Sequence, residues 1–414
     1  MTSSSSTRQR RPSGRTVRRV VPLAAVAVLG LGLLNPIGAA TAAQTDQVVT
    51  WGASADKVTG SFTDQTVRNL VHTSIGGPAV QISLSNVFGD RTVTFDSVYV
   101  GIQTGSAAAL APGSNREVTF SGQPTVTVPA GAEVLSDPVD TTVPADTTIA
   151  VSVHVVGASG ALTGHNFTAQ TSYASAAGDF AADESGTPFA QTVSRWYWVD
   201  AVVVEAPKQV DTVAFLGDSI TDGVGSTTNT NRRYPDYVAD RLATRPTVHR
   251  FGIMNEGISG NRVLVDSAGV SVQARFDRDV LSQPDVHTVI VMEGINDIGN
   301  GTATSADQLI AAYKQLIARA HAKDVCIIGA TMTPFEGAGY YSEAKEQIRS
   351  AVNEFIRTSG AYDGIVDFDQ ATRDPANPKR FLPAYDRGDH LHPSDNGYAA
   401  MANALDLSLL ECSR

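Results

Sequence analysis

Short apolar runs separated by turn-forming residues fill the chain from about residue 48 to residue 204. Runs such as residues 92–95 and 125–128 alternate polar and apolar positions, and Gly, Pro, Asp and Asn lie between the runs at short intervals. An alternation with a period of two is typical of strands that bury one face. No segment here has a convincing helical period. The pattern therefore predicts an all-β sandwich domain over residues 44–206.

The pattern changes near Pro207, where apolar runs begin to alternate with segments of helical period. The runs that predict strands are residues 213–216, 248–254, 288–292, 325–330 and 365–368. The segments that predict helices are residues 234–242, 272–281, 306–322, 343–358 and 395–410. This alternation predicts an α/β domain over residues 207–414, in which a parallel sheet lies between helices on both faces. Binding and catalytic residues of such sheets lie in the loops after the carboxyl ends of the strands.

The first 43 residues have the pattern of an export signal rather than of a folded domain. Six arginines between residues 8 and 19 precede an apolar run over residues 20–34, and small residues lead to Ala40, Thr41 and Ala42. This order is typical of a secretory signal peptide that is cleaved after residue 42 or 43. The apolar run is also short for a membrane span. We therefore expect a secreted, extracellular protein without a stable membrane anchor.

Removal of this segment would leave a strongly acidic protein. The whole chain has 31 Lys and Arg residues against 42 Asp and Glu residues. The first 43 residues hold six Arg and no acidic residue, so the remainder has 25 basic and 42 acidic residues, a formal charge of −17. A charge of this sign and size repels phosphate backbones and anionic lipid headgroups. The composition therefore argues against nucleic acid as a partner and leaves the oligomeric state open.

The chain has two cysteines, and the sequence does not decide whether they are joined. Cys326 lies in an apolar strand-like run and Cys412 lies almost at the C-terminus. An extracellular location permits a disulfide between them, but two buried free thiols fit the sequence nearly as well. Neither cysteine has the neighbours expected of a nucleophile or of a metal cluster.

Two motifs with backbone donors follow the first two predicted strands of the α/β half. Residues 217–223 place Ser219 at a strand-to-helix turn, where flanking glycines let its hydroxyl and its N–H face a ligand. Residues 255–261 contain Gly260, whose N–H can come close to a substrate oxygen. Taken singly, these motifs have ordinary structural explanations as a helix cap and a glycine-rich turn.

Two further motifs supply side chains suited to proton transfer and oxyanion binding. Asn296, after the strand predicted at residues 288–292, offers a carboxamide donor with no proton that could be lost. Asp389 lies three residues before His392, so its carboxylate can hold one ring nitrogen while the other takes a proton from a serine. Asp389 could instead cap a helix, or bind a metal with His390 and His392. This spacing supplies at most three ligands, and no other cluster completes a metal site.

Together, the motifs G-D-S-I, N-x-G-x-S-G, G-x-N-D and D-x-x-H occur in the order and approximate spacing of the GDSL/SGNH hydrolase family, which residues 211–410 resemble. The resemblance implies a flavodoxin-like three-layer α/β/α domain and no metal or organic cofactor. It also implies Ser219 as the nucleophile, His392 as the general base and Asp389 as its partner. The oxyanion hole would consist of the Ser219 N–H, the Gly260 N–H and the Asn296 side chain.

The β-rich half also resembles a known domain. Residues 49–52, 66–69 and 84–89 are similar to the domain that precedes the hydrolase domain in a group of secreted actinobacterial GDSL esterases. No residue role is carried over from that domain. Trp196, Tyr197 and Trp198 fit either a sugar-stacking strip or a sandwich core, and we favour the core because large aromatic side chains mostly bury area.

The expected activity is hydrolysis of carboxylic esters through an acyl-enzyme on Ser219, with a small-molecule or polysaccharide ester as substrate. The motifs do not separate acylated carbohydrates from short-chain or lipid esters. Three alternatives remain at this stage. They are a secreted carbohydrate-binding protein with a silent hydrolase domain, an acyltransferase using the same residues, and a metal-dependent hydrolase using His390 and His392.

Overall fold

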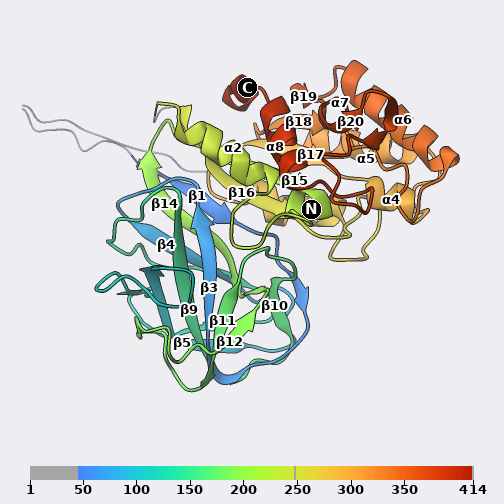
Figure 1. Ribbon diagram of the computed structural model, residues 1–414. Helices are drawn as coiled ribbons and strands as arrows, with labels where there is room; N and C mark the ends of the chain where they lie inside the picture. The colour runs from blue at the N-terminus through green and yellow to red at the C-terminus, as the bar shows by residue number, and fades with distance from the viewer. Residues whose placement is uncertain (1–44, 247–248, 413–414) are drawn as a thin grey trace, which may run out of the picture. The chain divides into compact units, whose positions relative to one another are not determined.

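The computed structural model describes residues 45–246 and 249–412 (Figure 1). These residues belong to one compact unit. The predicted signal peptide, residues 1–43, lies outside the described residues. Within the described ranges, no helix has the length and apolar character needed to cross a membrane.

Residues 45–207, here called the β region, form three antiparallel sheets. Their strand orders are β1-β14-β4-β8, β13-β10-β2 and β12-β11-β3-β9-β5-β6, with β7 paired to β5. The strands are β1 (Thr45–Gly52), β2 (Asp56–Val58), β3 (Thr63–Thr73), β4 (Val80–Ser85), β5 (Val93–Ile102), β6 (Arg116–Glu117), β7 (Val126–Val128), β8 (Glu133–Leu135), β9 (Thr147–Ala158), β10 (Leu162–His165), β11 (Ser172–Ala177), β12 (Gln191–Val193), β13 (Trp196–Tyr197) and β14 (Val199–Pro207).

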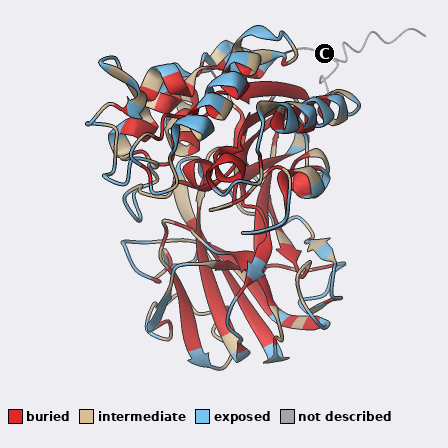
Figure 2. Ribbon diagram, turned by 90° about the vertical axis from the view of Figure 1, so that its right-hand side faces the viewer, coloured by how far each residue is buried: buried red, intermediate tan, exposed pale blue. Residues whose placement is uncertain are grey.

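Side chains from all three sheets contribute to one large hydrophobic core, and a smaller cluster lies around Leu70 and Phe189. On β5, for example, Val93, Phe95 and Val98 are buried, whereas Asp96 between them is exposed. Figure 2 shows buried residues along the strands and exposed residues concentrated at the turns. Trp198 is fully buried and packs against Phe95 with ring centroids 5.3 Å apart. The predicted all-β sandwich and the core position of the aromatic segment are confirmed.

Residues 212–412, here called the α/β region, are built on five parallel strands in the order β16-β15-β17-β18-β19. The strands are β15 (Thr212–Gly217), β16 (Gly252–Gly257), β17 (Val286–Met292), β18 (Cys326–Ala330) and β19 (Gly364–Val366). The helices are α1 (Ser219–Asp222), α2 (Tyr234–Ala243), α3 (Val272–Phe276), α4 (Ile295–Gly299), α5 (Ala306–His321), α6 (Glu343–Thr358), α7 (Phe368–Thr372) and α8 (Asp395–Ala404). A short hairpin, β20 (Arg373–Asp374) and β21 (Asn377–Phe381), precedes α8.

Alternate side chains of the inner strand β15 enter two separate cores, which explains the three layers. Val213 and Phe215 of β15 pack in one core with residues of α2 and α8. Ala214 and Leu216 pack in the other with residues of α3, α5 and α6. Both faces of the parallel sheet are therefore covered, and the strand order, 2-1-3-4-5, is that of flavodoxin-like folds. The predicted flavodoxin-like three-layer α/β/α fold is confirmed.

Some predicted boundaries are wrong, for local reasons. The second strand was expected at residues 248–254 but begins at Gly252 and continues to Gly257, because it pairs with β15 over its whole length. The fifth strand ends at Val366, because the Asp367 side chain accepts a hydrogen bond from the Gln370 N–H and caps α7. The last helix stops at Ala404 and is followed by a 3₁₀ turn, Leu407–Glu411.

Cys326 of β18 and Cys412 are joined by a disulfide, so the question that the sequence left open is answered. The bond ties the end of the chain to the parallel sheet.

The β region lies along the edge of that sheet, at β16. Ala53 forms a parallel bridge with Asn255. The Ile253 N–H donates to Ser74 Oγ at 2.9 Å. The Val49 N–H donates to Thr212 Oγ1 at 3.0 Å, so β1 contacts β15 as well.

Candidate active site

Ser219 is the first residue of α1, two residues after the end of the inner strand β15. The Asp218 side chain accepts a hydrogen bond from the Ile220 N–H at 2.9 Å and caps this short helix. Burial raises the pKa of Asp218 to about 7. A side chain at Gly217 would collide with Thr221 Oγ1 and the Met292 carbonyl, so only glycine lets the turn lie this close to β17. The turn thus presents the Ser219 hydroxyl at the carboxyl end of the sheet.

His392 lies in the loop before α8 and reaches Ser219. Its Nε2 is 2.8 Å from Ser219 Oγ, and its Nδ1 is 2.8 Å from Asp389 Oδ2. The other Asp389 oxygen accepts the Leu391 and His392 N–H groups at 3.0 and 2.8 Å. The carboxylate therefore fixes both the backbone of the loop and the orientation of the imidazole, leaving Nε2 toward the serine.

The surroundings of this pair favour a neutral histidine beside a charged aspartate. Burial lowers the pKa of His392 by more than the hydrogen bond and charge of Asp389 raise it. Burial acts to raise the pKa of Asp389, but hydrogen bonds from His392 and from the Leu391 N–H outweigh it and leave that pKa below its usual value. At neutral pH the imidazole can therefore accept a proton.

Asn296 lies in α4, which follows β17, and Gly260 lies in the loop that follows β16. Asn296 is in the first turn of α4, and its Nδ2 is buried without a hydrogen-bond partner among the described residues. A buried, unsatisfied donor in a native structure calls for an explanation, and a ligand oxygen is one. Gly260 has φ = +81°, a conformation that favours glycine.

Two side chains from the same motifs hold these loops together. Asp297 accepts the Val263 and Leu264 N–H groups at 2.8 and 3.0 Å. Asn261 donates to the Ala268 and Val270 carbonyls at 2.8 and 2.9 Å. The loop that carries Gly260 is thus anchored to the helix that carries Asn296. The sequence indicated these two anchoring residues, because Asn261 directly follows Gly260 and Asp297 directly follows Asn296.

Arg275 of α3 is a buried residue of the site that the sequence pattern did not reveal. Its guanidinium donates to the Gly217 carbonyl at 3.0 Å, to the Glu256 carbonyl at 2.8 Å and to Asn261 Oδ1 at 3.0 Å. It also donates to Ser54 Oγ of the β region at 2.7 Å. Because an arginine on a short amphipathic helix usually faces solvent, nothing local indicates this position.

The His390 ring bonds to Asp386 and not to the pair formed by His392 and Asp389. Its Nδ1 contacts Asp386 Oδ2 at 2.6 Å. The arrangement proposed for a metal, with Asp389, His390 and His392 sharing an ion, therefore has no counterpart in the hydrogen bonds of this loop.

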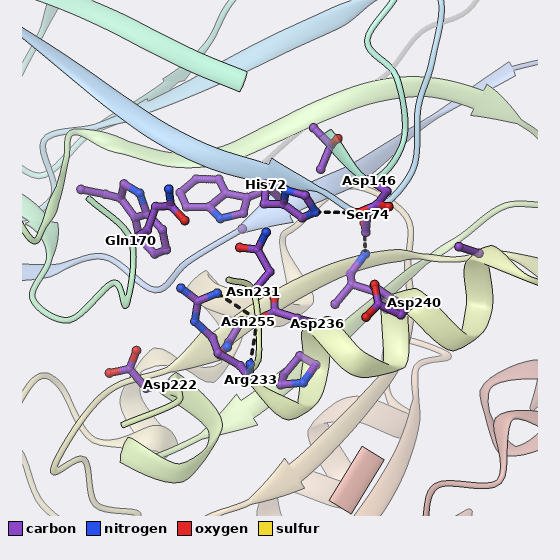
Figure 3. A pocket seen from close by; sticks show the side chains of 18 of the residues that line it. His72, Ser74, Asp146, Gln170, Asp222, Asn231, Arg233, Asp236, Asp240 and Asn255 are labelled. Carbon is purple, nitrogen blue, oxygen red and sulfur yellow. Dashed lines mark hydrogen bonds and ion pairs between the residues drawn. The ribbon is translucent and has the colours of Figure 1, made fainter. Parts of the chain in front are cut away.

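Two pockets lie where the β region meets the α/β region, and neither is lined by Ser219 or His392. Figure 3 shows one of them, in which His72 and Gln170 of the β region face Arg233 and Asp236 at the start of α2. The other lies against the loop after β16, at Ser259 and Ala268. His165 and Asp222 line both pockets.

Comparison with known proteins identifies the family of the α/β region. The model of the GDSL-like lipase/acylhydrolase family matches residues 215–400, a span that includes Ser219, Gly260, Asn296, Asp389 and His392. Residues 215–400 form a GDSL-like lipase/acylhydrolase domain. This is the family that the four motifs indicated.

Solved structures and curated proteins add little to that match. A GDSL-like lipase from Bacteroides thetaiotaomicron has 21% identity and a TM-score of 0.38, over 49% of this chain and 88% of its own. An acetylxylan esterase from Geobacillus stearothermophilus has 25% identity and a TM-score of 0.37, over 49% of this chain and 95% of its own. No curated protein matches the sequence significantly.

Proposed function

We propose that the protein is a serine esterase that hydrolyses carboxylic esters through an acyl-enzyme on Ser219. The observation that carries the proposal is the continuous set of hydrogen bonds from Ser219 through His392 to Asp389, both at 2.8 Å. A nucleophile, a base and a group that orients the base are the parts that acyl transfer to serine requires. The family of residues 215–400 supports the same class of reaction.

In the proposed mechanism, His392 takes the Ser219 proton as Oγ attacks the ester carbonyl carbon. The carbonyl becomes a tetrahedral oxyanion, which the Ser219 N–H, the Gly260 N–H and the Asn296 side chain stabilise. Collapse of this intermediate releases the alcohol, which His392 protonates. His392 then removes a proton from water, which attacks the acyl-enzyme, and returns that proton to Ser219 as the acid leaves.

We further propose that the enzyme is secreted and that its substrate is an acylated carbohydrate or a short-chain or lipid ester, with acylated carbohydrate as the first class to test. The formal charge of −17 outside residues 1–43 disfavours anionic lipid surfaces. The disulfide between Cys326 and Cys412 fits an oxidising compartment, where such bonds persist.

The test compares residues 44–414 with the Ser219→Ala variant on nitrophenyl esters from acetate to palmitate and on acetylated xylan. We expect the parent to hydrolyse short esters and the variant to be inactive. Equal activity of the two proteins would exclude the serine mechanism. If both proteins are folded and inert, labelling with a fluorophosphonate distinguishes two explanations. A catalytically silent domain would not be labelled, whereas an active serine whose substrate is missing from the panel would be labelled. Adding acceptor alcohols then tests for acyl transfer.

A further inference from the structure

A second histidine–aspartate pair joins the β region to the helix of the nucleophile. His165, the last residue of β10, and Asp222, the last residue of α1, are both buried. His165 Nε2 lies 3.0 Å from Asp222 Oδ1, and His165 Nδ1 lies 2.9 Å from the Ser54 carbonyl oxygen. Neither the family motifs nor the proposed mechanism uses His165.

The contacts of this pair define its protonation state. A carbonyl oxygen only accepts, so His165 Nδ1 must donate to Ser54. Asp222 Oδ2 accepts the Ser259 N–H at 2.9 Å and the Ser259 hydroxyl at 2.5 Å. The Asp222 carboxyl group opposite Nε2 favours a proton on that nitrogen as well, which is the imidazolium form of His165. Burial lowers the pKa of His165, but the charge and hydrogen bond of Asp222 outweigh it and raise that pKa above its usual value.

Asp222 connects this cation to the backbone of the proposed oxyanion hole. Its Oδ2 holds Ser259, the residue immediately before Gly260, by both the N–H and the hydroxyl. Its own N–H donates to the Asp218 carbonyl at 2.9 Å, within the turn that presents Ser219. Besides the contacts of Asn261 and Asp297, the position of the Gly260 amide relative to Ser219 therefore depends on the orientation of the Asp222 carboxyl group, whose other oxygen His165 contacts.

We propose that His165 is a positioning residue for ester hydrolysis, holding Asp222 so that the Gly260 N–H points to the carbonyl oxygen of the substrate. The β region thereby contributes to turnover without touching the substrate. This inference rests on the proposed function, because it assigns a role to His165 only if the Gly260 amide serves as an oxyanion donor.

The test replaces His165 with Gln and uses His154→Gln as the matched control. His154 is a buried histidine on β9 whose Nδ1 lies 2.6 Å from Asp96, and the hydrogen bond joins two residues of the β region. Both variants thus lose a histidine–aspartate pair from the same region. We expect His165→Gln to lower kcat about 10- to 100-fold with KM changed less than about threefold, since loss of a whole donor lowers kcat about 100- to 1000-fold. His154→Gln should leave kcat within about twofold.

A double variant tests whether the effect passes through the oxyanion hole. If His165 and Asn296 act on the same oxyanion, His165→Gln should lower kcat much less in an Asn296→Ala background than in the parent, because residues that act as a unit are not additive. Full multiplication of the two effects would overturn the proposal. So would a loss of kcat in His165→Gln no greater than in His154→Gln.

Ser259→Ala provides a second test if His165→Gln does not fold. It removes the hydroxyl donor to Asp222 Oδ2 but keeps the backbone N–H donor. We expect kcat to fall about 3- to 10-fold with KM unchanged, which is less than the loss expected when a whole oxyanion donor is removed. Unchanged kcat in Ser259→Ala would overturn the proposal. Failure of the proposed function gives a different result, because parent and Ser219→Ala would then be equally active or equally inert.

Discussion

Two histidine–aspartate pairs contact the helix that begins at Ser219, and they differ in solvent exposure and in what the second ring nitrogen faces. The His392 and Asp389 side chains are 14% and 40% exposed, and the remaining nitrogen of His392 faces the Ser219 hydroxyl. The His165 and Asp222 side chains are 5% and 4% exposed, and the remaining nitrogen of His165 faces a carbonyl oxygen.

This difference decides what each histidine can do. A hydroxyl can give up its proton, so a neutral imidazole beside it can act as a base. A carbonyl can only accept, so the ring nitrogen of His165 beside it must keep its proton, and the Asp222 carboxyl group opposite the other nitrogen favours a second proton there. The pKa shifts follow the same division, downward for His392 and upward for His165. The same two residue types therefore favour a neutral imidazole at one end of α1 and a protonated imidazole at the other.

The largest expected effect separates the two histidines directly. His392→Ala should lower kcat by about 10⁴-fold or more on nitrophenyl acetate, because removal of one member of a serine triad loses most of the chemical acceleration. Fluorophosphonate labelling of Ser219 should be lost in parallel, while the melting temperature stays close to that of the parent. A loss smaller than about tenfold would mean that His392 is not the base.

Replacement of Asn296 tests the oxyanion hole, which the pair His165–Asp222 is proposed to orient, and its expected effect is smaller. Asn296→Ala should lower kcat about 100- to 1000-fold with little change in KM, because its carboxamide would act on the charge that develops in the transition state. Steady-state kinetics with nitrophenyl acetate measures this. Circular dichroism of the variant serves as the control, and normal turnover would remove Asn296 from the mechanism.

The pH profile gives a third, more graded comparison. The base must be neutral, so kcat/KM should fall as pH drops through the pKa of His392, which lies below its usual 6.5. Asp389 raises that pKa, so in Asp389→Asn the acid limb should move to still lower pH. Because Asp389 is partly exposed, we expect kcat to fall only about 10- to 100-fold, less than in fully buried triads. An acid limb that moves upward in this variant would contradict the assignment.

Removal of the disulfide should have the smallest effect on activity. It serves as a control for a change that lowers stability without altering the catalytic residues. The double variant Cys326→Ala/Cys412→Ala should lower the free energy of unfolding by about 2–5 kcal/mol, because a long loop is no longer closed in the unfolded chain. Thermal unfolding, compared with and without reductant for the parent, measures this. Activity at 25 °C should stay within about twofold, and a large loss of kcat would mean that the end of the chain influences the site.

The local sequence pattern predicted the fold and the pair Asp389–His392. It did not predict the pair His165–Asp222. Asp389 and His392 are three residues apart in one loop, so their contact could be predicted from spacing alone. His165 and Asp222 are 57 residues apart, and their meeting depends on how the β region packs against α1. Arg275 reaches Ser54 across 221 residues for the same reason. No periodicity encodes such contacts, because they arise only when two separately patterned halves pack together.

The boundary errors have a related cause. The apolar run that precedes Asn255 suggested a strand that ends before the motif. The structure extends β16 through Asn255 to Gly257, because the hydrogen bonds of β15 are available along its whole length. Strand pairing thus overrode the hydrophobic pattern, and the donor loop begins later than the sequence indicated.

The bridge between Ala53 and Asn255 bears on how this protein can be divided. β16 is an outer strand of the parallel sheet, and β1 runs beside it with Val48 and Val49 buried. An α/β region produced alone would leave this strand uncovered, with free backbone groups next to apolar side chains, which is a template for intermolecular pairing. We therefore expect the isolated α/β region to self-associate, so that it cannot be produced as an independent module unless another segment covers this edge.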